Sequence, residues 1–138
     1  MKFVLTTPLY YVNDVPHLGS TYTTVASDAL ARFHRCIGNQ VKFITGVDEH
    51  GQKIQRAAEK KGMEPKAFCD EISKTFFDLS KTLNLSNDDF IRTTEKRHKK
   101  AVENLWNILE KKNEIYLSKY SGWYSVSDEA YYLSLIHI

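Results

Sequence analysis

The first sixty residues alternate between short apolar segments and longer amphipathic segments. This pattern predicts strands at residues 3–6 and 41–45 and helices at residues 20–37 and 52–61. Pro8 ends the first strand because proline cannot donate to a sheet ladder, and Gly38 is a natural end for the first helix. Alternating strands and helices are typical of a parallel sheet with right-handed crossovers. The sequence therefore predicts an α/β fold.

Apolar residues at helical spacing predict which face of each helix is buried. The stripe of the first helix consists of Tyr22, Val25, Ala26, Ala29, Leu30 and Phe33. A helix that starts near Pro65 carries Phe68, Ile72, Phe76, Leu79 and Leu83 on one face. A helix over residues 95–112 is expected to turn Val102, Leu105, Trp106 and Leu109 inward. A β-prone tail that is rich in aromatic residues follows.

Composition narrows the class of protein. The chain has 138 residues, and its fractions of hydrophobic residues (42%) and charged residues (26%) exclude a disordered tail, a collagen-like fibre and a disulfide scaffold. No apolar run approaches the ~20 residues that span a bilayer. The apolar run at the start of the sequence is too short for a signal peptide. A net charge of +2 neither requires nor excludes nucleic acid. Cys36 and Cys69 form no Cys-x-x-Cys motif, so we expect buried thiols and a cytoplasmic protein without a membrane partner.

The loop after the first strand ends in His17-Leu18-Gly19-Ser20, directly before a helix. A helix N-terminus presents free N–H groups and a positive dipole end, both of which suit phosphate. Gly19 allows close approach to the backbone, His17 can donate to a phosphate oxygen, and Ser20 can donate or cap the helix. The alternative is a structural helix entry with Pro16 at the turn. Both interpretations stay open on these residues alone.

The loop after the second strand, residues 46–51, is polar and flanked by glycines. Asp48 can hold an ammonium group through a charge-assisted hydrogen bond. In the structural alternative Asp48 is a helix N-cap and Glu49 a first-turn acid. A metal site made of Asp48, Glu49 and His50 is a third interpretation, but three adjacent side chains rarely converge on one ion. Any Mg²⁺ is expected to arrive with a nucleotide.

Together these segments resemble the N-terminal part of the methionyl-tRNA synthetases, a family of class I aminoacyl-tRNA synthetases. The matching runs include Thr-Pro-Leu-Tyr-Tyr-Val-Asn at residues 7–13, Pro-His-Leu-Gly-Ser at 16–20, Phe-Ile-Thr-Gly-Val-Asp-Glu-His-Gly at 43–51, Arg-Thr-Thr at 92–94 and Gly-Trp-Tyr-Ser at 122–125. They extend over nearly all of residues 3–132. This ordered series is far more specific than any single motif in it.

The resemblance implies the first half of a Rossmann-like parallel sheet, the class I synthetase catalytic domain, over residues 1–114, and the start of a connective insertion over residues 115–138. It implies a ligase that activates methionine with ATP and transfers the methionyl group to tRNA(Met) for protein translation. The methionine carboxylate is already a nucleophile at neutral pH. Catalysis then consists of positioning and of stabilising phosphoryl charge.

By position, His17, Leu18, Gly19 and Ser20 match the ATP signature of the family, which is usually His-Ile-Gly-His. The resemblance makes His17 and Ser20 the expected catalytic residues. Ser20 replaces the second histidine of the signature. A hydroxyl group still offers a hydrogen bond but carries no positive charge, so we expect weaker phosphate contacts there.

Three further residues match the methionine site of the family. Asp48 matches the carboxylate that holds the α-ammonium group of methionine. Leu9 and Tyr11 match residues that line the methionine pocket, where an aromatic ring beside the thioether gains ~0.3–1.5 kcal/mol. The alternative for Leu9 and Tyr11 is ordinary loop packing.

The sequence departs from the family pattern in three places. Many relatives carry Cys-x-x-Cys zinc ligands where this chain has Ser125 and Asp128, so no zinc is expected. The Lys-Met-Ser-Lys-Ser loop, the second half of the nucleotide-binding fold and the anticodon-binding domain are absent. We therefore expect the chain alone not to aminoacylate tRNA. Residues 133–138 are expected to lie outside the family pattern.

Two other functions remain as alternatives. One is a different adenylate-forming enzyme with a similar nucleotide signature, against which Asp48 and Tyr11 argue. The other is a non-catalytic RNA-binding module derived from a synthetase. The basic run from Arg92 through Lys100 can contact RNA phosphates, although such a run is more often the solvated face of a helix.

Overall fold

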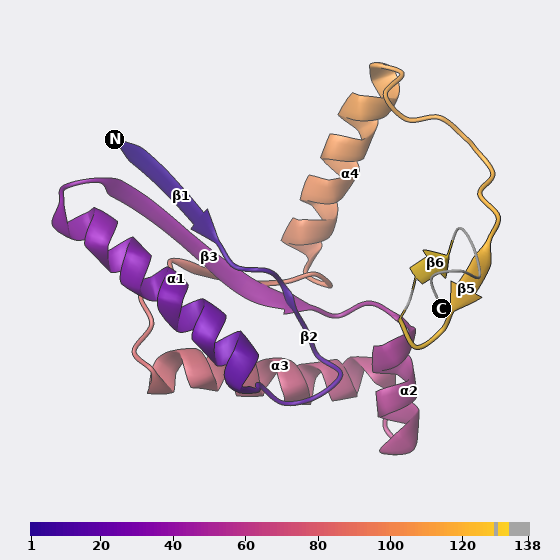
Figure 1. The fold of residues 1–138 in the computed structure, drawn as a ribbon, viewed down its shortest axis with the longest axis horizontal. Coiled ribbons are helices and arrows are strands. Elements are labelled where there is room, and N and C mark those ends of the chain that lie inside the picture. Colours follow the sequence, from indigo (N-terminus) through magenta and orange to yellow (C-terminus); the bar gives the residue numbers. More distant parts are fainter. Residues whose placement is uncertain (129, 133–138) are drawn as a thin grey trace. The chain divides into compact units, whose positions relative to one another are not determined.

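The computed structural model describes residues 1–128 and 130–132, which fall into two compact units, Met1–Val102 and a second unit from Glu103 onward. The elements in chain order are β1 (Lys2–Thr6), β2 (Tyr10–Tyr11), α1 (Leu18–Cys36), β3 (Gln40–Asp48), α2 (Gln52–Lys60), α3 (Pro65–Thr82), β4 (Asp89–Arg92), α4 (Lys96–Lys111), β5 (Trp123–Ser125) and β6 (Ala130–Tyr132) (Figure 1). The predicted α/β class is confirmed.

The first unit is built on a parallel sheet with β3 at its centre. Ile44 pairs with Thr6 of β1 and with Asp89 of β4, so these two strands flank β3 on opposite sides. Val47 likewise pairs with β2 and β4. β2 therefore continues the line of β1 along the same side of β3, and the carboxyl ends of β2, β3 and β4 meet at one edge of the sheet.

The core lies between the sheet and the helix α3. Phe43, Thr45 and Val47 alternate along β3 and are at most 2% exposed, so they form the covered face of the strand. On α3 the buried apolar side chains are Phe68, Cys69, Ile72 and Phe76. The predicted stripe of α3 is therefore confirmed for Phe68, Ile72 and Phe76.

The predicted buried face of α1 is wrong. Its buried residues are Ser20, Thr24, Asp28 and Ala31, while Tyr22, Val25, Leu30 and Phe33 of the predicted stripe are 41–75% exposed. The polar residues are buried because each finds a partner. The Asp28 carboxylate accepts hydrogen bonds from the Ser86 backbone N–H, the Ser86 hydroxyl and Arg32. Long-range hydrogen bonds, and not the apolar periodicity, thus determine which face of this helix is buried.

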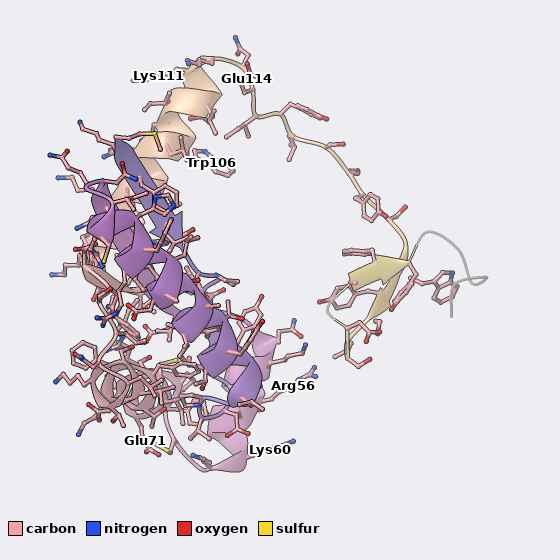
Figure 2. All side chains as sticks on the ribbon, turned by 60° about the vertical axis from the view of Figure 1, so that its left-hand side comes forward. Arg56, Lys60, Glu71, Trp106, Lys111 and Glu114 are labelled. Carbon is pink, nitrogen blue, oxygen red and sulfur yellow. The ribbon has the colours of Figure 1, made fainter. Side chains whose placement is uncertain are left out.

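The predicted inward face of α4 is also wrong. No residue of α4 is buried, and Val102, Leu105 and Trp106 are 51–58% exposed. Figure 2 labels Trp106 on this helix. The apolar spacing was sufficient to predict the helix itself. It did not establish that another element of the described chain covers that face.

The structure adds strand residues that the sequence placed in loops. Tyr10 and Tyr11 form β2, and β4 was not predicted at all. β3 continues through Asp48, so half of the predicted polar loop at residues 46–51 is strand. A Cβ atom at Gly46 would lie 2.1 Å from the Ile91 carbonyl oxygen. The glycine is therefore needed to let β4 approach β3, rather than to form a turn.

The two cysteines differ in environment. Cys69 of α3 is 3% exposed, and burial raises the pKa of its thiol. Cys36, the last residue of α1, is exposed. The prediction of a buried thiol is confirmed for Cys69 and wrong for Cys36.

The second unit contains an antiparallel hairpin of β5 and β6. The Tyr131 ring contacts the rings of Tyr120 and Tyr124 at centroid distances of 5.1 and 5.0 Å, and the β-prone aromatic tail is confirmed here. A domain boundary after residue 114 stays a prediction. Residues 133–138, the predicted atypical tail, lie outside the described residues.

Candidate active site at the carboxyl edge of the sheet

The carboxyl edge of the sheet brings together residues from separate parts of the chain. In the register of β2 and β3, Tyr11 lies opposite Asp48. The loop after β2 leads to the N-terminus of α1 at His17 (Figure 1). In open α/β sheets, ligands bind beyond the carboxyl ends of the strands. The sequence thus predicted correctly which loops form this edge.

His17 is the N-cap of α1. Its Nδ1 accepts a hydrogen bond from the Gly19 backbone N–H at 3.0 Å, and the side chain is exposed. Because Nδ1 is the acceptor, a neutral imidazole carries its hydrogen on Nε2. The Nε2–H is then a donor at the positive end of a 19-residue helix.

Ser20 is buried and holds His17 in place. Its Oγ donates to the His17 carbonyl oxygen at 2.8 Å and accepts from the His17 backbone N–H at 3.1 Å. The predicted helix start at Ser20 is therefore wrong by two residues, and Ser20 serves as the N3 member of a capping box. Its one hydrogen is already donated, so a direct bond to phosphate would require this cap to open.

Gly19→Ala is expected to disturb the cap of α1, where the sequence predicts nucleotide binding, while leaving the fold intact. A Cβ atom at Gly19 would lie 2.9 Å from His17 Cε1, so the imidazole ring must move and the bond from the Gly19 N–H is lost. Alanine favours the helix by about 1 kcal/mol over glycine, which offsets the lost cap. We expect a raised KM for ATP in an active enzyme that contains this helix start, and an unchanged urea midpoint for the chain itself. A variant with unchanged KM would show that the orientation of His17 does not matter.

The Asp48 carboxylate is held through one oxygen only. Oδ1 accepts the His50 backbone N–H at 3.2 Å and the Thr93 hydroxyl at 3.1 Å. None of the described residues donates a hydrogen bond to Oδ2, and the side chain is 30% exposed. Asp48 is not an N-cap, because that position belongs to Gly51. A fixed carboxylate with one open oxygen suits an ammonium group.

The two tyrosines of β2 point to opposite faces, as alternation along a strand requires. The Tyr10 hydroxyl lies 2.7 Å from Thr24 Oγ1, and its ring stacks on Phe76. Tyr11 is 55% exposed beside Asp48, and Leu9 is 37% exposed in the preceding loop. Tyr10 thus belongs to the core, whereas Tyr11 and Leu9 remain accessible to a ligand.

Sequence reasoning missed the role of Glu49. Its side chain is fully buried and forms an ion pair with Arg92 at 2.6 Å. Ser73 and Thr94 also donate to this carboxylate, and Arg92 bridges onward to Asp70. Arg92 lies 43 residues away in the sequence. The only feature of the sequence that could have drawn attention to this ion pair was that Arg92 belongs to a run that matches the family.

Burial raises the pKa of the Glu49 carboxyl group, but hydrogen bonds from Ser73, Thr94 and Arg92 outweigh burial, and the pKa lies below its usual 4.5. The ionised carboxylate therefore stabilises the fold above about pH 4.5, and this contribution is lost as the pH falls through the lower pKa of the folded state. Glu49 is thus a charged structural group and not a free first-turn acid.

The described residues contain no group of three His, Cys, Asp or Glu side chains that could hold a metal ion. Glu49 turns into the core, away from Asp48 and His50, whose Oδ1 and Nδ1 atoms lie 3.6 Å apart, so the three side chains do not converge on one ion. The basic run is divided as well. Arg92 is partly buried and ion-paired, whereas Lys96, Lys99 and Lys100 are exposed, as a solvated helix face predicts.

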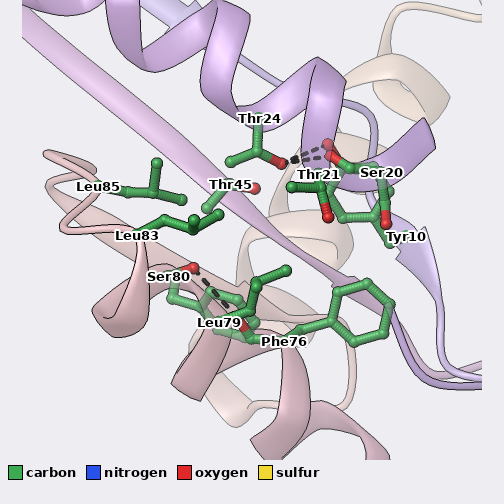
Figure 3. Close-up of a pocket in the computed structure, with 11 residues that line it drawn as sticks. Tyr10, Ser20, Thr21, Thr24, Thr45, Phe76, Leu79, Ser80, Leu83 and Leu85 are labelled. Carbon is green, nitrogen blue, oxygen red and sulfur yellow. Dashed lines mark hydrogen bonds between the residues drawn. The ribbon is translucent and has the colours of Figure 1, made fainter. Parts of the chain in front are cut away.

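A small cavity lies behind this edge, between α1, β3 and α3 (Figure 3). Its lining includes Tyr10, Ser20, Thr45 and Phe76, and its volume is about 10 Å³. That space holds about one water molecule. It is too small for an amino acid or a nucleotide, so this cavity holds neither, whereas Tyr11, His17 and Asp48 remain accessible on the open side of the edge.

Comparison with known proteins shows the family to which the chain belongs. The family model described as tRNA synthetases class I (M) matches residues 3–135. The chain belongs to this family. The match includes residues 133–135, so three of the six tail residues that we expected outside the family pattern lie within it.

Two relatives show how far the similarity extends. The methionine–tRNA ligase of Rickettsia typhi is 57% identical over 130 residues, which cover 94% of this chain and 26% of that protein. The methionine–tRNA ligase of Halalkalibacterium halodurans is 54% identical over 130 residues, covering 94% of this chain and 20% of that protein. The chain thus spans between a fifth and about a quarter of the length of these relatives.

Solved structures of methionyl-tRNA synthetases match the fold of this chain. The Mycobacterium tuberculosis methionyl-tRNA synthetase in complex with methionyl-adenylate matches with a TM-score of 0.88 and 42% identity, over 95% of this chain and 26% of that chain. The parallel sheet is therefore that of the Rossmann-like catalytic domain of this family. Within the described residues, no helix is long and apolar enough to cross a membrane.

Proposed function

We propose that this chain forms the N-terminal part of a methionine–tRNA ligase, in which it binds methionine and ATP for adenylate formation. The observation that carries the proposal is the open Oδ2 of Asp48, at the same sheet edge as the His17 cap of α1. A site for an ammonium group and a site for phosphate thereby share one edge. The names of the relatives, all methionine–tRNA ligases, support methionine as the amino acid.

In the proposed reaction a carboxylate oxygen of methionine attacks the α-phosphorus of ATP. The bond from the α-phosphorus to the bridging oxygen breaks, pyrophosphate leaves, and methionyl-adenylate remains. No proton has to be removed from the attacking carboxylate. The described residues offer hydrogen-bond donors and a fixed carboxylate but no base beside a nucleophile, which fits catalysis by positioning.

In the nucleotide half of the site, His17 donates from Nε2 to phosphate, and the N–H group of Leu18 at the start of α1 faces the same charge. The Gly19 N–H contributes by holding His17 Nδ1. Ser20 keeps the role that its hydrogen bonds indicate, which is to hold His17. Its contribution to catalysis is therefore indirect in this proposal. Mg²⁺ enters with ATP and adds positive charge at the phosphates.

In the amino-acid half of the site, Asp48 Oδ2 receives the α-ammonium group. Tyr11 and Leu9 line the side-chain pocket, where the tyrosine ring suits a thioether. The identity of the amino acid distinguishes this proposal from another adenylate-forming enzyme. A non-catalytic RNA-binding module would respond to neither methionine nor ATP.

We propose tRNA(Met) as the macromolecular partner and the cytoplasm as the location. We propose no zinc site at residues 125–128. The Ser125 hydroxyl donates to Asp128 at 2.6 Å, and Tyr132 donates to the same carboxylate. Zinc in structural sites prefers thiolate and imidazole ligands, which this hairpin does not supply at those positions.

The proposal is tested with a hybrid enzyme in which the 130 matched residues of this chain replace their counterparts in the Halalkalibacterium halodurans ligase. We expect pyrophosphate exchange into ATP that depends on methionine and is not supported by leucine or isoleucine. We expect the chain alone to show no exchange. A soluble, folded hybrid without methionine-dependent exchange would contradict the proposed function.

A further inference from the structure

Thr93 follows β4 directly and ties it to the end of β3. Its backbone N–H donates to the Val47 carbonyl oxygen at 3.3 Å, and the residue is 7% exposed. Its hydroxyl contacts three consecutive residues of the site edge. These contacts are to Asp48 Oδ1 at 3.1 Å, the Glu49 backbone nitrogen at 2.9 Å and His50 Nδ1 at 3.0 Å.

The hydrogen-bonding capacity of this hydroxyl is fully used. A threonine hydroxyl has one hydrogen and two lone pairs. The hydrogen goes to Asp48 Oδ1, and the Glu49 N–H can only donate. The bond to His50 therefore has Nδ1–H as the donor. With one donated and two accepted bonds, the hydroxyl has a single orientation and fixes both side chains.

These contacts determine where Asp48 points. Oδ1 is held by the Thr93 hydroxyl and by the His50 N–H, so a rotation of the carboxylate breaks two hydrogen bonds. We propose that Thr93 is a positioning residue for methionine, which keeps Oδ2 of Asp48 facing the α-ammonium group. This inference rests on the proposed function, because it requires Asp48 to bind the substrate.

A purely structural role for Thr93 would require fewer hydrogen bonds than the structure shows. The Thr93 backbone N–H that donates to Val47 and the Thr93 hydroxyl that accepts from the Glu49 N–H are enough to join the ends of β3 and β4. The bonds to the Asp48 and His50 side chains add nothing to that connection. They do restrict the two groups at the accessible edge, as preorganisation of a binding site requires. The two roles therefore predict different kinetic effects.

The test uses the hybrid enzyme with Thr93→Val, which keeps the shape of the side chain but removes the hydroxyl. We expect the KM for methionine to rise about tenfold, as for one hydrogen bond to a charged group. The KM for ATP should stay within about twofold, because His17 is not contacted. Thr93→Ser retains the hydroxyl and should restore the KM for methionine. Thr93→Ala replaces the valine variant if the latter does not fold.

A second readout isolates the ammonium group. Inhibition by 4-(methylsulfanyl)butanoate, which is methionine without its amino group, should not change in Thr93→Val. Adding Thr93→Val to Asp48→Asn should raise the KM for methionine no further, because Thr93 acts through Asp48. Additive effects, or an equal rise in both KM values, would overturn the positioning role. If Asp48→Asn alone leaves the KM for methionine unchanged, the proposed methionine site fails, and this inference with it.

Discussion

Replacing Arg92 with methionine is expected to lower the free energy of unfolding by about 3–5 kcal/mol, the usual loss when one partner of a buried ion pair is removed. The Glu49 carboxylate is fully buried, and Arg92 supplies its only positive partner among the described ion pairs. Without Arg92, the carboxylate must either stay charged in the core or take up a proton. Both outcomes lower the free energy of unfolding.

The measurement is urea unfolding of the chain at neutral pH, followed by circular dichroism. Arg97→Met is a matched control, because Arg97 pairs with Asp89 and Glu95 but is 51% exposed. Exposed pairs contribute little, so the control should unfold close to the parent. The double variant Glu49→Gln, Arg92→Met removes both charges and should be more stable than Arg92→Met alone. Equal losses for Arg92→Met and Arg97→Met would contradict this account.

The sequence predicted the parallel fold because strand and helix alternate clearly, and it predicted α3 because the buried face of that helix is apolar. It failed on α1 for a physical reason. Asp28 is buried by bonds to Ser86, which lies 58 residues further along the chain. No local pattern indicates that a carboxylate will find such partners. Periodicity therefore predicts a buried face correctly only where apolar contacts alone bury the helix.

The candidate site likewise contains some residues that the sequence indicated and others that only the structure revealed. His17 and Asp48 were recognisable because each follows a strand in a motif of known chemistry. The contacts of Thr93 were not recognisable, and for Ser20 the choice between capping and phosphate binding stayed open, because both depend on the acceptor to which each hydroxyl donates its one hydrogen. Arg92 was assigned to a basic run, although burial beside Glu49 makes it a structural residue. Local sequence thus indicated the groups that we propose to contact a substrate, and the tertiary structure was needed to find the groups that hold them.

Asp48→Asn in the hybrid enzyme is expected to lower kcat/KM for methionine about 10- to 150-fold, which corresponds to one hydrogen bond to a charged group. The amide oxygen can keep both bonds that Oδ1 accepts from His50 and Thr93. The amide NH₂ then takes the place of Oδ2 and points its own hydrogens at the ammonium group. The substitution thus preserves the local structure and removes the attraction.

Asp14→Asn is the control, because it removes the same charge from the loop after β2, where the Val15 backbone N–H is the one donor to this carboxylate among the described residues. That variant should retain kcat/KM within about twofold. The KM for ATP should be unchanged in both variants, because the cap at His17 does not involve either carboxylate. If the two variants lost activity equally, the effect would come from net charge at the site edge. Only a loss specific to Asp48 supports a direct bond to the methionine ammonium group.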